Sequence, residues 1–167
     1  MNNYNPDIHH RHSFRLQGYD YSQEGLYFVT ICTHEHKYLF GEIKNDHMTL
    51  NNIGEIIKQT WFDLPNHIPN IILDAFCIMP NHIHGIIEIT SPNVGAGSKP
   101  AQLSEIIRQF KTFSARKINI IRKIPGTPVW QRNYYEHIIR NNHAYDNIYS
   151  YILNNPKKWN EDKMFGK

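Results

Sequence analysis

"AFCIMPNHIHGIIEIT", residues 75–90, sets two histidines one residue apart within a run of otherwise apolar side chains. An apolar run of this kind, rich in isoleucine, is typical of a buried β-strand. Residues i and i+2 of a strand face the same side, so we expect His82 and His84 to project together while Ile83 points away. Two neighbouring imidazoles can hold one divalent cation. The alternative is a pair of hydrogen-bonded histidines on a half-exposed face.

The segments around this stretch predict a ferredoxin-like α+β fold. The order of strands and helices is β-α-β-β-α-β, which forms a four-stranded antiparallel sheet with helices on one face. An inserted β-hairpin and an extra C-terminal helix complete the arrangement. The predicted strands are 26–33, 70–80, 82–89 and 129–140, the hairpin is 38–51, and the predicted helices are 52–65, 103–123 and 141–156.

Length and composition are those of one globular domain. The chain has 167 residues, of which 40% are hydrophobic, and its formal net charge of +3 is compatible with nucleic acid as a partner. We expect a single domain over 1–167, with an N-terminal arm over 1–18 and a mobile loop over 91–102. The start of the chain does not resemble a signal peptide, and no apolar run is long enough to span a membrane. These features favour a cytoplasmic protein without membrane contact.

A metal site needs ligands beyond the two histidines, and the last predicted helix offers one. Tyr151 and Asn155 are four residues apart, so they lie on one helical face. An amide oxygen is an acceptable ligand for Mg²⁺ or Mn²⁺, and a tyrosine hydroxyl beside such a site is a candidate nucleophile. The alternative for Tyr151 is an ordinary core or surface tyrosine. A second histidine pair, His34 and His36, lies in a polar context and is interpreted as solvated surface.

Five blocks of the sequence, in order, resemble the REP-associated tyrosine transposases, a group of the single-tyrosine HUH transposases. The likeness runs from about Arg11 to Trp159. The broader insertion-sequence transposases usually carry glutamine where this chain has Asn155, whereas the REP-associated group carries asparagine. The blocks are "RHSFRLQGYDYSQEGLYFVTICT", "MPNHIHGIIEI", "IIRQFKTFSARKIN", "VWQRNYYEHIIRN" and "YILNNPKKW".

The resemblance implies a function and a set of site residues. It implies binding of single-stranded DNA with hairpins, and DNA cleavage by transesterification that depends on Mg²⁺ or Mn²⁺. By the resemblance, His82, His84 and Asn155 hold the metal and Tyr151 attacks the scissile phosphate. A 5′-phosphotyrosine link and a free 3′-OH would result. Tyr134 and Tyr135 are rival nucleophiles, ranked lower because neither has an amide placed as Asn155 is.

Basic and aromatic side chains supply candidate DNA contacts. Arginine and lysine bind phosphates, and tyrosines can stack on unpaired bases. The alternative for each charged residue is a solvated face without a partner. The candidates are Arg11, Arg15, Tyr19 and Tyr21 in the arm, Arg108 and Lys111 in the helix 103–123, and Arg132 in the strand 129–140.

Two other functions are compatible with the same residues. The fold can hold DNA hairpins without cutting them, as a binding module. The histidines alone can serve a metal-dependent enzyme that acts on RNA or a nucleotide. The sequence leaves open the DNA sequence that is recognised, the choice between Mg²⁺ and Mn²⁺, and whether the protein is a monomer or a homodimer.

Overall fold

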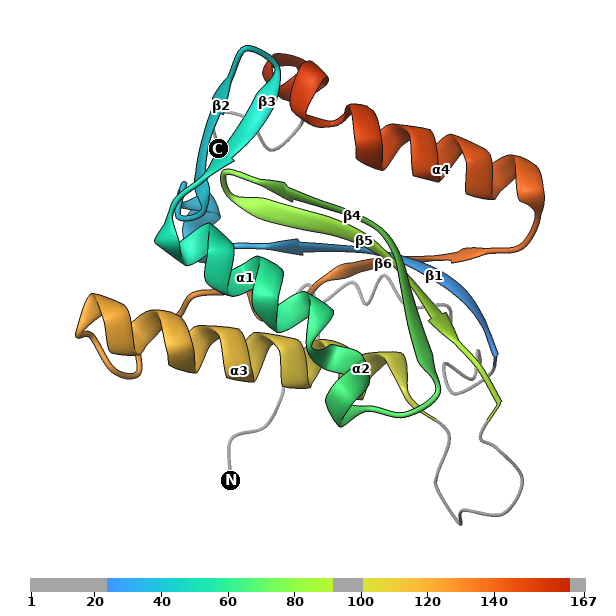
Figure 1. The fold of residues 1–167 in the computed structure, drawn as a ribbon, viewed down its shortest axis with the longest axis horizontal. Coiled ribbons are helices and arrows are strands. Elements are labelled where there is room, and N and C mark those ends of the chain that lie inside the picture. Colours follow the sequence, from blue (N-terminus) through green and yellow to red (C-terminus); the bar gives the residue numbers. More distant parts are fainter. Residues whose placement is uncertain (1–23, 92–100, 163–167) are drawn as a thin grey trace, which may run out of the picture.

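The central feature is a four-stranded antiparallel sheet in the order β4-β5-β1-β6 (Figure 1). The structure is a computed structural model that describes residues 24–91 and 101–162. This order and direction are those of the predicted ferredoxin-like fold, which is therefore confirmed. The elements are β1 (Gly25–Cys32), η1 (His34–His36), β2 (Gly41–Lys44), β3 (His47–Leu50), α1 (Asn52–Phe62), α2 (Leu64–His67), β4 (Ile71–Met79), β5 (His82–Ile89), α3 (Leu103–Arg122), β6 (Tyr135–Ile139), α4 (Asn142–Asn154) and η2 (Pro156–Glu161).

The sheet is covered on both faces, and each face has its own apolar core. On one face, α1 and α3 pack against alternate residues of β1, among them Tyr27, Val29 and Ile31. On the other face, α4 packs through Ile152 against a smaller cluster that includes Phe28 of β1. Figure 1 shows α1 and α3 below the sheet and α4 above it. The extra helix thus covers the face that a ferredoxin-like fold leaves open.

The β4–β5 hairpin positions the two histidines. Pro80 and Asn81 form its turn, since Met79 pairs with His82 across the two strands. The strand period then sends Ile83 into the core below the sheet, and His82 and His84 to the face that α4 covers.

The inserted hairpin β2–β3 turns through two residues with positive φ, Asn45 at 49° and Asp46 at 62°. Two such residues in a row are typical of the type I′ turn, in which asparagine and aspartate are tolerated. Asn51, just after the hairpin, caps α1 by accepting hydrogen bonds from the N–H groups of Ile53 and Gly54. The hairpin predicted over 38–51 is therefore present.

The last strand is shorter than its alternating sequence predicts. A strand over 129–140 was expected, but β6 covers only Tyr135–Ile139, and Trp130 makes an isolated bridge to Thr33. The cause is Lys111 of α3, whose ammonium group donates to the carbonyls of Gln131 and Asn133 at 3.0 Å each and of Arg132 at 3.3 Å. These carbonyls accept hydrogen bonds from Lys111 instead of from a neighbouring strand, so the segment is a loop.

Local capping and a hydrogen bond to β4 help to fix α4. Asn141 is its N-cap and accepts a hydrogen bond from the Ala144 N–H at 2.8 Å. The Tyr145 hydroxyl donates to Asp74 of β4 at 2.6 Å. Asp74 lies where the β4–β5 register shifts, between Leu73 and Phe76. The hydrogen bond from Tyr145 to this irregular part of β4 therefore anchors α4 to the sheet.

Part of the predicted organisation concerns segments that the structure does not describe. The arm predicted over 1–18 lies outside the described residues, and so does most of the loop predicted over 91–102. The assignment of 1–167 to one domain stays a prediction. Among the helices of the described part of the chain, none is both long enough and apolar enough to cross a membrane.

Candidate active site

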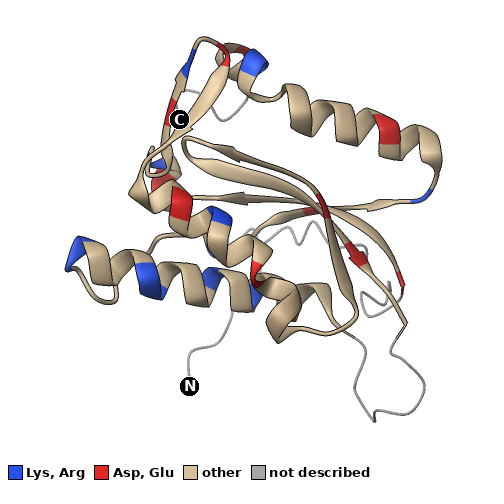
Figure 2. Ribbon diagram, viewed as in Figure 1, with Lys and Arg blue, Asp and Glu red and all other residues tan. Residues whose placement is uncertain are grey.

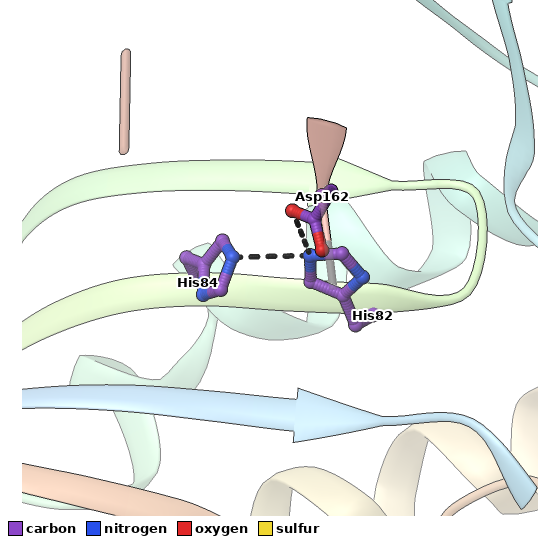
Figure 3. A group of neighbouring side chains, drawn as sticks. All are labelled: His82, His84 and Asp162. Carbon is purple, nitrogen blue, oxygen red and sulfur yellow. Dashed lines mark hydrogen bonds and ion pairs between the residues drawn. The ribbon is translucent and has the colours of Figure 1, made fainter. Parts of the chain in front are cut away.

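The two histidines of β5 form the centre of the candidate site (Figure 3). The His82 side chain is fully buried and His84 is 3% exposed. Their Nε2 atoms lie 3.0 Å apart, and the planes of their rings meet at 70°. Both side chains thus project from the same face of the sheet, as the strand period predicts.

A neighbouring polar group holds the second nitrogen of each imidazole. Nδ1 of His82 donates to Oδ1 of Asn81 at 2.8 Å, and the amide nitrogen of Asn81 donates to the carbonyl of His36 at 3.3 Å. Nδ1 of His84 lies 2.8 Å from the hydroxyl of Thr30, a group that can donate or accept. Both Nε2 atoms can therefore direct lone pairs toward one point between them.

Burial keeps both histidines neutral near pH 7. It lowers the pKa of His82 from the ordinary 6.5 to about 4, although the Asp162 carboxylate acts in the opposite direction. Burial also lowers the pKa of His84 well below its ordinary value, and the neighbouring His82 adds to that effect. The neutral imidazole is the form that binds a metal ion.

The metal-free protein is expected to lose stability as the pH falls from 6.5 toward about 4. In this window the unfolded chain takes up protons at His82 that the folded chain does not, so the free energy of unfolding decreases with falling pH. Urea unfolding at stepwise pH measures the effect. The double variant His82→Gln/His84→Gln should show a flatter dependence, and a dependence equal to that of the wild type would contradict this assignment.

Tyr151 and Asn155 reach the histidines from α4 and its end. The Tyr151 hydroxyl lies 3.3 Å from Nε2 of His84, and the two rings meet edge to face at 5.1 Å. Burial, the largest effect, and the charge of Asp162 raise the pKa of Tyr151, whereas a hydrogen bond from the Asn155 side chain lowers it. The two residues predicted to share a helical face are therefore together beside the histidine pair.

Asp162 is a site residue that sequence reasoning missed. Its Oδ2 lies 3.8 Å from Nε2 of His82, and its side chain is 6% exposed. Figure 3 shows the carboxylate above the His82 ring, and Asp162 is the first residue after η2. Asp162 belongs to no strand or helix period that reaches the histidines, so no local pattern in the sequence indicated it.

A cavity of about 670 Å³ opens beside the histidine pair. Its lining includes His84, Tyr135, Tyr151 and Lys158. His36, interpreted from the sequence as solvated surface, is half-buried and lines the same cavity. It does so because η1 folds back onto the β4–β5 turn, where the Thr33 N–H donates to the carbonyl of Asn81 at 2.9 Å.

The candidate DNA contacts are spread over several surfaces. Arg108 lies on α3 and pairs with Glu105 through two hydrogen bonds, whereas the ammonium group of Lys111 is occupied by the three carbonyls described above. Arg132 is exposed between Gln131 and Asn133, which both line the cavity. The other four candidates, Arg11, Arg15, Tyr19 and Tyr21, lie outside the described residues.

The donor atoms of the site fit a divalent cation. Two ligands that bind one ion at about 2.1 Å and at a right angle lie about 3.0 Å apart, and the two Nε2 atoms are 3.0 Å apart. Asn155 is 2% exposed, and within the described residues its Oδ1 receives no hydrogen bond. A buried oxygen of this kind is suited to a cation, since an unpaired buried acceptor costs free energy.

Comparison with known sequences identifies the family of this chain. Residues 22–155 match the sequence profile of the family described as IS200-like transposases. A protein of Haemophilus influenzae, described as uncharacterized, is 45% identical over 179 residues, which cover 97% of each chain.

Two solved structures share the fold. The structure of a REP-associated tyrosine transposase bound to a REP hairpin matches with a TM-score of 0.61 and 20% identity, covering 89% of this chain and 77% of that one. A Deinococcus radiodurans protein described as a transposase candidate matches with a TM-score of 0.51 and 19% identity, covering 84% of this chain and 95% of that one. At these identities the likeness concerns the fold.

Proposed function

Because the chain belongs to the IS200-like transposase family, we propose that it cleaves and rejoins single-stranded DNA by transesterification, with Tyr151 as the nucleophile. One observation carries the proposal: the Tyr151 hydroxyl lies 3.3 Å from Nε2 of His84, which is itself 3.0 Å from Nε2 of His82. The proposed nucleophile therefore lies beside the two nitrogens that are proposed to bind the metal ion.

In the proposed reaction, the Tyr151 oxygen forms a bond to the scissile phosphorus and the bond from phosphorus to the 3′ oxygen breaks. The phenol loses its proton and the departing 3′ oxygen gains one. A 5′-phosphotyrosine and a free 3′-OH result, and the reverse attack by a 3′-OH rejoins the strand. One phosphodiester replaces another of similar energy, so the reaction needs no nucleotide triphosphate.

His82, His84 and Asn155 would hold the cation, Mg²⁺ or Mn²⁺. When bound, the cation supplies Lewis-acid stabilisation of the negative charge that develops on the phosphate. Asn81 and Thr30 orient the two imidazoles through their Nδ1 atoms. Phe28 stacks on His84 with ring centroids 5.5 Å apart, which limits rotation of that ring.

The cavity beside the histidines supplies a path for the scissile strand. Its volume of about 670 Å³ exceeds that of one nucleotide, and it carries exposed aromatic rings at Tyr135 and Tyr151. Such rings can stack on unpaired bases. Lys158 in the lining and the exposed Arg132 beside it are positioned to contact phosphates.

Helix α3 is a second candidate surface for the duplex part of the DNA. Figure 2 shows lysine and arginine along this helix, on the side of the sheet away from α4. Arg108 is exposed there and can contact phosphates. Lys111 contributes mainly by holding the segment 131–133 at the cavity wall. Arg11, Arg15, Tyr19 and Tyr21 remain proposed contacts on the basis of the sequence.

We further propose that the substrate contains a hairpin. The REP-associated relative of the same fold was solved with a REP hairpin bound. We also propose that one protomer forms a complete site, because the Tyr151 hydroxyl lies 3.3 Å from Nε2 of His84 in the same chain.

The test is formation of a covalent adduct. The full chain, Mn²⁺ and a labelled hairpin oligonucleotide with single-stranded flanks are mixed and then denatured. We expect a labelled species at the mass of protein plus DNA, and no such species with a chelator in place of Mn²⁺. Hairpin binding without an adduct under any metal would instead favour the non-cleaving binding module. Turnover of RNA or a nucleotide by a Tyr151→Phe protein would favour the other alternative, a metal-dependent enzyme that acts on these substrates through the histidines alone.

A further inference from the structure

Asp162 brings a carboxylate to the histidine pair from a separate part of the chain (Figure 3). Its Oδ2 is 3.8 Å from Nε2 of His82, and one ligand atom from each of Asp162, His82 and His84 lies within 4.8 Å of the other two. The Asp162 side chain is 6% exposed.

The position of Asp162 is determined by packing. Its N–H donates to the carbonyl of Trp159 at 3.0 Å, which closes the last turn of η2. The Trp159 side chain is buried, with its ring centroid 6.0 Å from that of His82 and 5.6 Å from that of Tyr38. The turn that carries the carboxylate is therefore fixed against the histidine that the carboxylate approaches.

We propose that Asp162 is an anionic ligand of the divalent cation, in addition to His82 and His84. This inference rests on the metal site of the proposed function and adds the ligand that sets the preference of that site among cations. Two neutral imidazoles and a neutral amide suit Zn²⁺ or Ni²⁺ as well as Mn²⁺. A carboxylate oxygen is the protein ligand that Mg²⁺ and Mn²⁺ favour, so Asp162 shifts the preference toward these harder cations.

The distances require little movement of the side chain. Ligands of one octahedral ion with bonds of about 2.1 Å lie about 3.0 Å apart when adjacent and about 4.2 Å apart when opposite. The distance of 3.8 Å between Oδ2 of Asp162 and Nε2 of His82 is about 0.8 Å longer than that of two adjacent ligands. A shift of the carboxylate of about 1 Å would therefore bring its oxygen to the distance of a ligand adjacent to His82.

The test measures metal binding without DNA and without cleavage. Mn²⁺ is titrated into the chelator-treated full chain, and the signal of free Mn²⁺ is followed by electron paramagnetic resonance. Asp162→Asn keeps the shape of the side chain but removes its charge and replaces one acceptor oxygen by an NH₂ group, and we expect Mn²⁺ to bind at least about tenfold more weakly. Zn²⁺ affinity should change by less than about threefold, because imidazole nitrogens suit Zn²⁺ well. Glu161→Gln, an exposed neighbour that also lines the cavity, is the matched control and should bind Mn²⁺ as the wild type does.

The outcomes separate this inference from the proposed function. Equal Mn²⁺ affinity in the wild type and Asp162→Asn, with loss in His82→Ala, would overturn the role of Asp162 and leave the histidine site intact. An equal loss of Mn²⁺ and Zn²⁺ affinity in Asp162→Asn would support Asp162 as a ligand but would overturn the claim that its carboxylate sets the preference among cations. If His82→Ala binds Mn²⁺ as the wild type does, the metal site of the proposed function fails, and the inference fails with it.

Discussion

Tyr151→Phe is expected to abolish the covalent adduct between protein and DNA while hairpin binding and folding stay close to those of the wild type. The substitution removes only the hydroxyl, which lies 3.3 Å from Nε2 of His84. Phenylalanine keeps the edge-to-face contacts of the ring with His84 and Phe28. Removing a catalytic nucleophile costs on the order of 10⁴ to 10⁶ in rate. Adduct formation should therefore fall below detection, whereas the dissociation constant for the hairpin should change by less than about threefold.

Tyr135→Phe is the matched control for this variant. Tyr135 lines the same cavity, is about as exposed as Tyr151, and its ring lies at the same 6.2 Å from Phe28. The Tyr135→Phe protein should still form the adduct. Peptide mapping of the trapped wild-type adduct identifies the modified residue directly. A phosphotyrosine at Tyr134 or Tyr135 would refute the assignment of Tyr151, although the family of the protein would be unaffected.

His82→Ala is expected to lower the rate of DNA cleavage by roughly two to four orders of magnitude. The reason differs from that for Tyr151→Phe. The change removes a nitrogen proposed to hold the cation, so Mn²⁺ affinity should fall with the rate of cleavage. Tyr151→Phe should leave Mn²⁺ affinity nearly unchanged. Hairpin binding is measured in parallel by fluorescence anisotropy and should persist in both variants.

Because His82 is fully buried, truncation to alanine also leaves a cavity that can lower stability. His82→Leu keeps more of the volume without supplying a ligand atom and is the second variant, with thermal unfolding as the check on folding. His34→Ala alters a histidine whose side chain is 40% exposed, and it should retain both activity and metal affinity. Full cleavage by a folded His82→Leu protein, which has no ligand atom at this position, would show that the histidine pair does not hold a required cation.

Local periodicity predicted much of the fold and the core of the site. The period of two in β5 set His82 and His84 on one face, and the helical period set Tyr151 beside Asn155. The order of strands and helices predicted the sheet, because ferredoxin-like connections leave one arrangement for β-α-β-β-α-β. These features depend on residues close in the chain, so one sequence is enough to predict them.

The predictions failed where a distant group competed with the local pattern. The alternation over 129–140 indicated a full strand, but Lys111 binds three carbonyls of that segment and holds it as a loop. His36 occupies a polar stretch, but η1 folds back and brings it to the cavity wall. In both cases a contact between segments far apart in the chain outweighed the local preference, and such contacts leave no periodic signal.

By itself the sequence determined three features. The family follows from five blocks in a fixed order, the order of the sheet from the succession of strands and helices, and the shared face of the two histidines from the period of two in a strand. Only the tertiary structure decided that α4 docks on the open face of the sheet, through Ile152 and the Tyr145–Asp74 hydrogen bond. That docking brings the Tyr151 hydroxyl to His84. Only the packing of Trp159 beside His82 decided that Asp162 joins them, because the approach of a carboxylate from another segment depends on how whole elements pack against one another.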